Sequence, residues 1–197
     1  YMDFTSRLVE RGYVVAVHRQ SYDSTNFEAI LEQIVDVHEV LQEINNSSSS
    51  PVVGSFGQFD LTHWGLGGHG VGAAGAYGVY PYWMNSSSHE TVQPPRGVFG
   101  LGTDFSDWGS NHWDELAPTT WPHIPAPPSV GLFLTGSADE VYSTLDVESV
   151  LVQGDGLGWQ LMELIGADHY QFQDSTSFFE GLGDGDASLT QEEQNSI

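Results

Sequence analysis

The sequence contains no cysteine and no lysine, and four arginines supply all of its fixed positive charge. Without cysteine the chain forms no disulfide, no thiolate metal site and no cysteine nucleophile. The 27 acidic side chains dominate and give a formal net charge of -23. Because such a charge repels phosphate backbones and anionic lipid, it argues against nucleic-acid binding and against a basic membrane-surface role. No apolar run approaches the roughly 18 residues of a transmembrane helix, so no transmembrane segment is expected.

The remaining composition is sufficient for a folded core. Hydrophobic residues make up 39% of the chain and aromatic residues 12%. A length of 197 residues fits one domain or two. Since no internal repeat is visible, we expect a single domain over residues 1–197.

Helical patterns alternate with short apolar runs. Residues 1–12 form a helical pattern that ends at Gly12, where a helix C-terminus favours glycine. Thr25 opens a capping-box pattern, and apolar residues then recur at helical spacing through Ile44. A polar loop is expected at 45–50. Strands are predicted at 13–17, 61–66, 98–101, 130–135 and 160–165, and a small-residue helix at 73–76. This alternation predicts an α/β fold with a mostly parallel sheet and helices on both faces.

The glycine-rich segment 68–72 lies between a predicted strand and a predicted helix. In that context the pattern G-x-S-x-G places a serine nucleophile on a strained turn. Gly68 and Gly72 occupy the outer glycine positions. The central position is Gly70, which has no side chain to act as a nucleophile.

Two downstream turns carry the residues expected of an acid and a base. Asp139 follows the apolar run 130–135, and His169 follows the run 160–165. A carboxylate at Asp139 would hold the His169 ring in one tautomer, which is the orienting role in a Ser-His-Asp triad. The backbone N–H of Val71, directly after the central glycine, would supply one oxyanion donor. His69 is expected to pack at the turn rather than to react.

Taken together, these segments resemble the α/β-hydrolase family of esterases, which includes chlorophyllases, polyester (PET) hydrolases and enzymes similar to dienelactone hydrolase. The resemblance implies an α/β-hydrolase fold with the acid at Asp139, the base at His169 and the nucleophile position at Gly70. It also implies family segments before Tyr1 and after Ile197, so the chain is expected to be a portion of a longer one. The similar segments are 8–15, 68–73, 134–139, 167–172 and 183–190.

Gly70 decides the functional expectation, because acyl transfer by this route needs a side-chain oxygen or sulfur. We expect a pseudoenzyme with a structural or binding role, whose partner is a protein or a small apolar or ester ligand. The alternative is an active carboxylic-ester hydrolase, similar to a chlorophyllase or polyesterase, in which Gly70 is engineered or misassigned. A third possibility is that His169 acts as a general base toward water.

Other features give weaker expectations. The stretch 182–193 resembles a calcium loop, but Leu182 replaces its first ligand and Ala187 its obligatory glycine, so no metal and no cofactor are expected. The tryptophan-rich loop 102–127 fits either a binding rim or a small satellite core. Three Asn-x-Ser sequons, at Asn45, Asn46 and Asn85, and the absence of lysine favour a secreted or organelle-lumen setting.

Overall fold

The computed structural model of the protein describes residues 2–17, 26–47, 49–85, 92–104, 130–153, 159–169 and 172. The three tryptophans of the loop 102–127 and the calcium-loop-like stretch 182–193 lie outside these ranges. None of the helices in the described ranges combines the length and the apolar character that crossing a bilayer requires.

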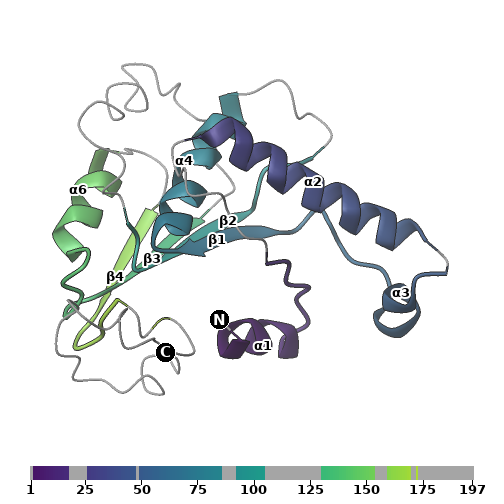
Figure 1. The fold of residues 1–197 in the computed structure, drawn as a ribbon, viewed down its shortest axis with the longest axis horizontal. Coiled ribbons are helices and arrows are strands. Elements are labelled where there is room, and N and C mark those ends of the chain that lie inside the picture. Colours follow the sequence, from purple (N-terminus) through teal and green to yellow (C-terminus); the bar gives the residue numbers. More distant parts are fainter. Residues whose placement is uncertain are drawn as a thin grey trace.

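Four parallel strands form one sheet, and their order in space follows their order in the chain (Figure 1). The register pairs Gly65 with Gly97, Val98 with Gly131 and Leu132 with Gln160. This arrangement confirms an α/β fold with a parallel sheet. The strands are β1 (Gly65–His69), β2 (Gly97–Leu101), β3 (Val130–Gly136) and β4 (Trp159–Leu164).

Helices cover the two sides of this sheet unequally. Figure 1 draws α2, α4 and α6 on one side and α1 on the other. On the α1 side, the ring of Phe4 lies 5.6 Å from the ring of Phe99 in β2. The helices are α1 (Met2–Glu10), α2 (Phe27–Asn46), α3 (Pro51–Phe56), α4 (Val71–Asn85) and α6 (Thr144–Gln153).

The main core lies between α2, α4 and the sheet. Leu31 of α2, Tyr77 of α4 and Phe133 of β3 each expose 1% or less of their surface. The rings of Tyr77 and Phe133 meet edge to face, with centroids 5.8 Å apart. Alanines in the first turns of α4, including Ala73 and Ala74, are fully buried and let the helix approach the sheet closely. This packing fixes the start of α4, where the candidate site lies.

Two strand predictions were wrong. Residues 13–17 form no strand, and Tyr13, Val14 and Val17 expose 61%, 54% and 72% of their surface. An apolar run becomes a strand only when a neighbouring strand pairs with it, and no described strand pairs with this one. The strand predicted at 61–66 begins instead at Gly65 and runs through glycine-rich sequence to His69.

The helix boundaries also differ from those predicted. The α2 helix is capped by Asn26, whose side-chain oxygen accepts a hydrogen bond from Ala29 N, one residue later than the predicted cap. The polar loop expected at 45–50 is shorter, because α2 continues through Asn46. The helix α3 was not predicted. It begins after Ser50, whose hydroxyl caps it, with Pro51 in its first turn.

Candidate functional site

The turn between β1 and α4 consists of one residue, Gly70. Its φ of +56° lies in the left-handed region, which a side chain enters only with strain. Gly70 N donates a hydrogen bond to Leu101 O at 3.0 Å, and Gly70 O accepts one from Asp104 N at 3.0 Å. These bonds join the turn to the end of the neighbouring strand β2. The predicted strand–turn–helix context of segment 68–72 is therefore present.

The glycines of this turn have different steric reasons for being there. A Cβ added to Gly68 would lie 2.5 Å from Gly72 O and 2.7 Å from Ala73 N, so a side chain at position 68 would collide with the backbone of α4. At Gly70 the nearest atom to an added Cβ is His169 Nε2, at 3.7 Å, which is an ordinary contact distance. Position 70 thus has room for a side chain directed at the imidazole of His169.

His169 and Asp139 form a buried pair at the same edge of the sheet. His169 Nδ1 donates to Asp139 Oδ2 at 3.0 Å. The histidine side chain is 5% exposed and the aspartate side chain 0%. The other carboxylate oxygen, Oδ1, accepts hydrogen bonds from Val141 N at 3.0 Å and Tyr142 N at 2.7 Å. Both oxygens of the buried carboxylate are therefore satisfied, and the ring that it holds has a fixed orientation.

Strand topology brings these residues together. The strands are parallel and adjacent, so their carboxyl ends meet at one edge of the sheet. Gly70 follows β1, Asp139 follows β3 and His169 follows β4. Val71, the predicted oxyanion donor, is the first residue of α4, where a backbone N–H has no partner within its own helix. All four residues named from the sequence lie around the same turn.

His69 makes a contact that the sequence did not indicate. Its Nε2 donates a hydrogen bond to the backbone oxygen of His169 at 3.1 Å, and the two rings lie 4.7 Å apart. Burial, followed by the charge of His169, lowers the pKa of His69 to about 4. His69 is therefore neutral near pH 7. Its hydrogen bond connects the end of β1 to the loop that carries His169. This contact is additional to the packing role expected for His69.

The loop after β2 also contributes to the site. Gly102 has a φ of +47°, and a Cβ there would lie 2.9 Å from His169 Nδ1. Thr103 and Asp104 are 1% and 5% exposed. None of these residues was predicted from the sequence to belong to the site. Asp139 and His169 were predicted because each follows an apolar strand. Thr103 and Asp104 also follow an apolar strand, so the same reasoning could have identified them.

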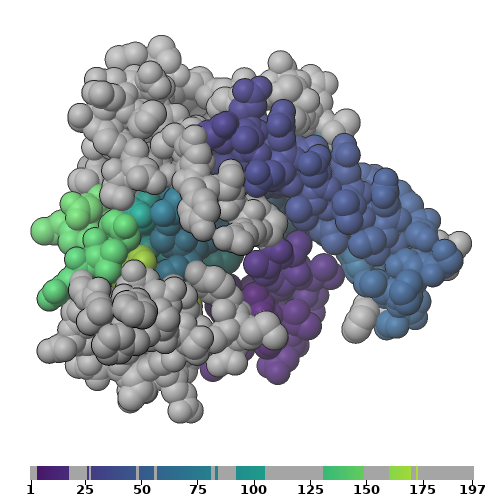
Figure 2. All heavy atoms as spheres, in the orientation of Figure 1, coloured from purple at the N-terminus to yellow at the C-terminus, as the bar shows by residue number. Residues whose placement is uncertain are grey.

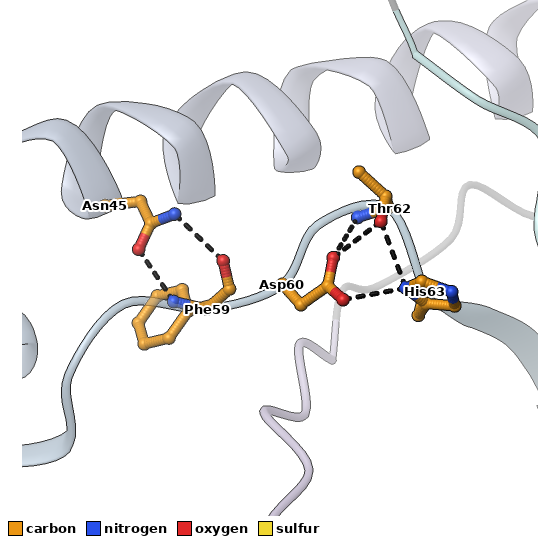
Figure 3. A network of polar contacts seen from close by, with 5 residues as sticks. All are labelled: Asn45, Phe59, Asp60, Thr62 and His63. Atoms are coloured by element: carbon orange, nitrogen blue, oxygen red, sulfur yellow. Dashed lines mark hydrogen bonds and ion pairs between the residues drawn. The ribbon is translucent and has the colours of Figure 1, made fainter.

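A second aspartate–histidine contact is exposed to solvent and lies in the turn just before β1 (Figure 3). Asp60 Oδ2 lies 2.7 Å from His63 Nδ1, and the two side chains are 61% and 68% exposed. Asp60 Oδ1 also accepts hydrogen bonds from Thr62 N at 2.9 Å and from the Thr62 hydroxyl at 2.7 Å. The Thr62 bonds, followed by His63, lower the pKa of Asp60 to about 2.

The surface turn is attached to α2 through Asn45. The side-chain amide of Asn45 donates to Phe59 O at 3.0 Å and accepts from Phe59 N at 2.7 Å (Figure 3). These contacts hold the chain just before β1. Among the described residues, no group of three or more metal-binding side chains occurs in this turn or elsewhere.

Searches for similar proteins gave no significant match for this chain among protein-family models, curated proteins or solved structures.

Proposed function

We propose that this chain is an α/β-hydrolase-fold protein whose hydrolytic site lacks its nucleophile at Gly70, and that it has a binding or structural role. One observation carries the proposal. The Cβ position of Gly70 lies 3.7 Å from Nε2 of His169, whose Nδ1 is hydrogen-bonded to the buried Asp139 at 3.0 Å. A serine at this position would stand where a triad nucleophile stands, next to a base held by an acid.

Glycine at position 70 accounts for the expected loss of ester hydrolysis. The covalent route needs an oxygen or sulfur to attack the carbonyl carbon, and Gly70 carries neither. Without a triad member, a hydrolase of this type keeps only about 10³- to 10⁴-fold acceleration over water, from binding and the oxyanion donors. The groups that recognise a carbonyl are retained in this proposal. They are the imidazole of His169 and the N–H of Val71.

These retained groups define the proposed ligand. A small molecule with an ester or carboxyl group would direct its carbonyl oxygen toward Val71 N–H and its apolar part away from the turn. A protein partner that inserts such a group would use the same contacts. Binding without turnover is the expected outcome in both cases.

The test compares the unmodified protein with Gly70→Ser and Gly70→Ala. Each is assayed with a chromogenic short-chain ester and with a serine-directed phosphonate. We expect no turnover and no labelling of the unmodified protein or of Gly70→Ala. Gly70→Ser is expected to be labelled at residue 70 and to hydrolyse the ester at least about 10³-fold faster than Gly70→Ala. Alanine is the matched control, because it adds the same Cβ at a positive φ without the hydroxyl.

Active ester hydrolysis by the unmodified chain is the second candidate, and the intact Asp139–His169 pair favours it. In that case His169 would take a proton from a water molecule as the water oxygen attacks the ester carbonyl carbon. The bond to the alcohol oxygen then breaks, and the protonated His169 returns the proton to that oxygen. Such turnover would disappear in His169→Ala and would leave no phosphonate label. Turnover by the unmodified protein that meets both criteria would overturn the pseudoenzyme proposal. A Gly70→Ser protein that folds but stays inert would overturn the assignment of the site.

A further inference from the structure

The helix α1 and the turn that follows it carry two of the four arginines of the chain, Arg7 and Arg11. Arg7 lies in the last turn of α1, and Arg11 directly follows the last helical residue, Glu10. The backbone N–H of Arg11 donates to Leu8 O at 3.1 Å, so the chain is still turning there and both arginines line the same cavity. Both are exposed.

The two arginines line an open cavity of about 490 Å³ together with Ser6 and Glu10. Phe4, on another side of the helix, contacts Phe99 of the sheet. The helix is thus held from one side, while the side chains of Arg7 and Arg11 are exposed. In Figure 2 the atoms of α1, in purple, are uncovered on the face in view.

No acidic residue neutralises this pair within the described ranges of the chain. The ion pairs recorded there join His63 to Asp60 and His169 to Asp139, and neither involves an arginine. Glu10 lines the same cavity without forming an ion pair with either guanidinium. Within the described ranges the two guanidiniums at this cavity form no ion pair, which leaves their N–H donors available to an external anion.

We propose that Arg7 and Arg11 bind the phosphate group of a small phosphate monoester. Each guanidinium offers a planar fork of N–H donors that matches two oxygens of an anion. A carboxylate has two oxygens and one charge, which satisfies a single fork. A phosphate monoester has three terminal oxygens and close to two negative charges near pH 7, so it satisfies both forks. The hydroxyl of Ser6, at the same cavity, supplies another donor.

The net charge of the protein limits the ligand to a small molecule. A nucleic acid would bring many phosphates close to a surface with a net charge of -23. A single phosphate held between the two guanidiniums contacts positive charge directly, and salt screens the more distant acidic groups over about 8 Å at physiological ionic strength. The site is separate from the Gly70 turn, so this proposal does not depend on the function proposed above.

The test is calorimetric titration of the whole protein with phenyl phosphate, with benzoate as the monoanionic control. The variants are Arg7→Gln, Arg11→Gln and Arg96→Gln. Arg96 is also exposed but lies before β2, so its variant makes the same charge change at a distance. We expect one saturable phenyl phosphate site that Arg7→Gln and Arg11→Gln each weaken about tenfold or more, while Arg96→Gln changes the affinity less than twofold. Circular dichroism checks that the variants remain folded.

The expected order of affinity is phenyl phosphate well above benzoate. Three outcomes would each overturn the proposal: no saturable phosphate binding by the unmodified protein, an equal loss of affinity in Arg96→Gln and Arg7→Gln, or benzoate binding as tightly as phenyl phosphate. The variant Arg11→Lys adds a geometric test, because lysine keeps the positive charge but lacks the planar fork of N–H donors of a guanidinium. Arg11→Lys is expected to bind several-fold more weakly than the unmodified protein.

Discussion

Two aspartate–histidine contacts in this molecule have similar lengths and opposite surroundings. Asp60 and His63 meet at 2.7 Å with more than half of each side chain in solvent. Asp139 and His169 meet at 3.0 Å with almost none of either side chain exposed. The first pair is three residues apart and forms within one turn, whereas the second is 30 residues apart and forms only when β3 and β4 pair.

The difference shows that a short distance alone does not define a functional pair. Solvent screens the contact between Asp60 and His63, so this ion pair contributes little to stability. The buried pair lies in a low-dielectric environment where an unpaired group is costly, and its geometry is therefore fixed. Only this second pair faces a position, Gly70, where a reacting atom could stand.

The largest effect is expected on activity in the Gly70→Ser background. Adding Asp139→Asn to that variant should reduce ester hydrolysis on the order of 10³-fold or more, because the His169 ring loses the acceptor that fixes its tautomer. Adding Asp60→Asn, the matched change at the surface pair, should leave the rate unchanged. Steady-state ester kinetics on both double variants tests this. Equal losses would show that the burial of Asp139 gives it no special role.

The second effect concerns stability. Asp139→Ala leaves the buried Nδ1–H of His169 and the N–H groups of Val141 and Tyr142 without their acceptor, and should lower the free energy of unfolding by about 3 kcal/mol or more. Asp60→Ala removes as many hydrogen bonds in solvent and should have a much smaller effect. Urea denaturation of the two single variants measures the difference. Similar losses from both would contradict the contrast between the pairs.

The third effect is on the pH dependence of stability, and it tests the buried environment of His69, next to the Asp139–His169 pair. The fold lowers the pKa of His69 from 6.5 to about 4, so the unfolded chain takes up a proton first as the pH falls. Stability should therefore decrease between pH 6.5 and 4, by up to roughly 3 kcal/mol from this group. In His69→Gln, which keeps a donor for His169 O, this part of the decrease should be absent. Denaturation at several pH values on both proteins checks the prediction. Parallel pH curves for both proteins would refute it.

The smallest effect concerns the surface pair. Because the Thr62 hydroxyl is the leading cause of the low pKa of Asp60, Thr62→Val should raise that pKa more than His63→Ala does. The contribution of Asp60 to stability is present above its ordinary pKa of 3.8 and is lost as the pH falls toward 2. NMR titration of the Asp60 carboxyl carbon measures these changes. A larger rise in His63→Ala would mean that the pair itself, rather than the turn, governs Asp60.

The sequence was sufficient for the parts of the fold that depend on local pattern. The predicted strands at 98–101 and 130–135 match β2 and β3, because apolar β-forming runs bounded by glycine there are buried in the sheet. The glycine spacing at 68–72 correctly located the turn, since a Cβ at Gly68 would collide with the backbone of Gly72. The order of the strands then explains why Asp139 and His169 meet.

Features that depend on distant neighbours were not predicted. The residue types at 13–17 favour a strand as strongly as those of β2, but pairing requires a partner that local sequence does not encode. At β1 the error was the opposite, because most of this strand was not predicted. Three of its five residues are glycines, which have low strand propensity. There the collisions that any side chain would cause at Gly67 or Gly68 matter more than propensity. The hydrogen bond from His69 to His169 O spans 100 residues and leaves no local signal.

The agreement between strand order and chain order has a consequence for synthesis of the protein. As the ribosome releases the chain, each new strand can join the exposed edge of the one made just before it, so the sheet β1-β2-β3-β4 can grow in one direction without waiting for later segments. His169, which completes the dyad with Asp139, emerges after all four described strands. Formation of that dyad would thus report that these four strands have emerged.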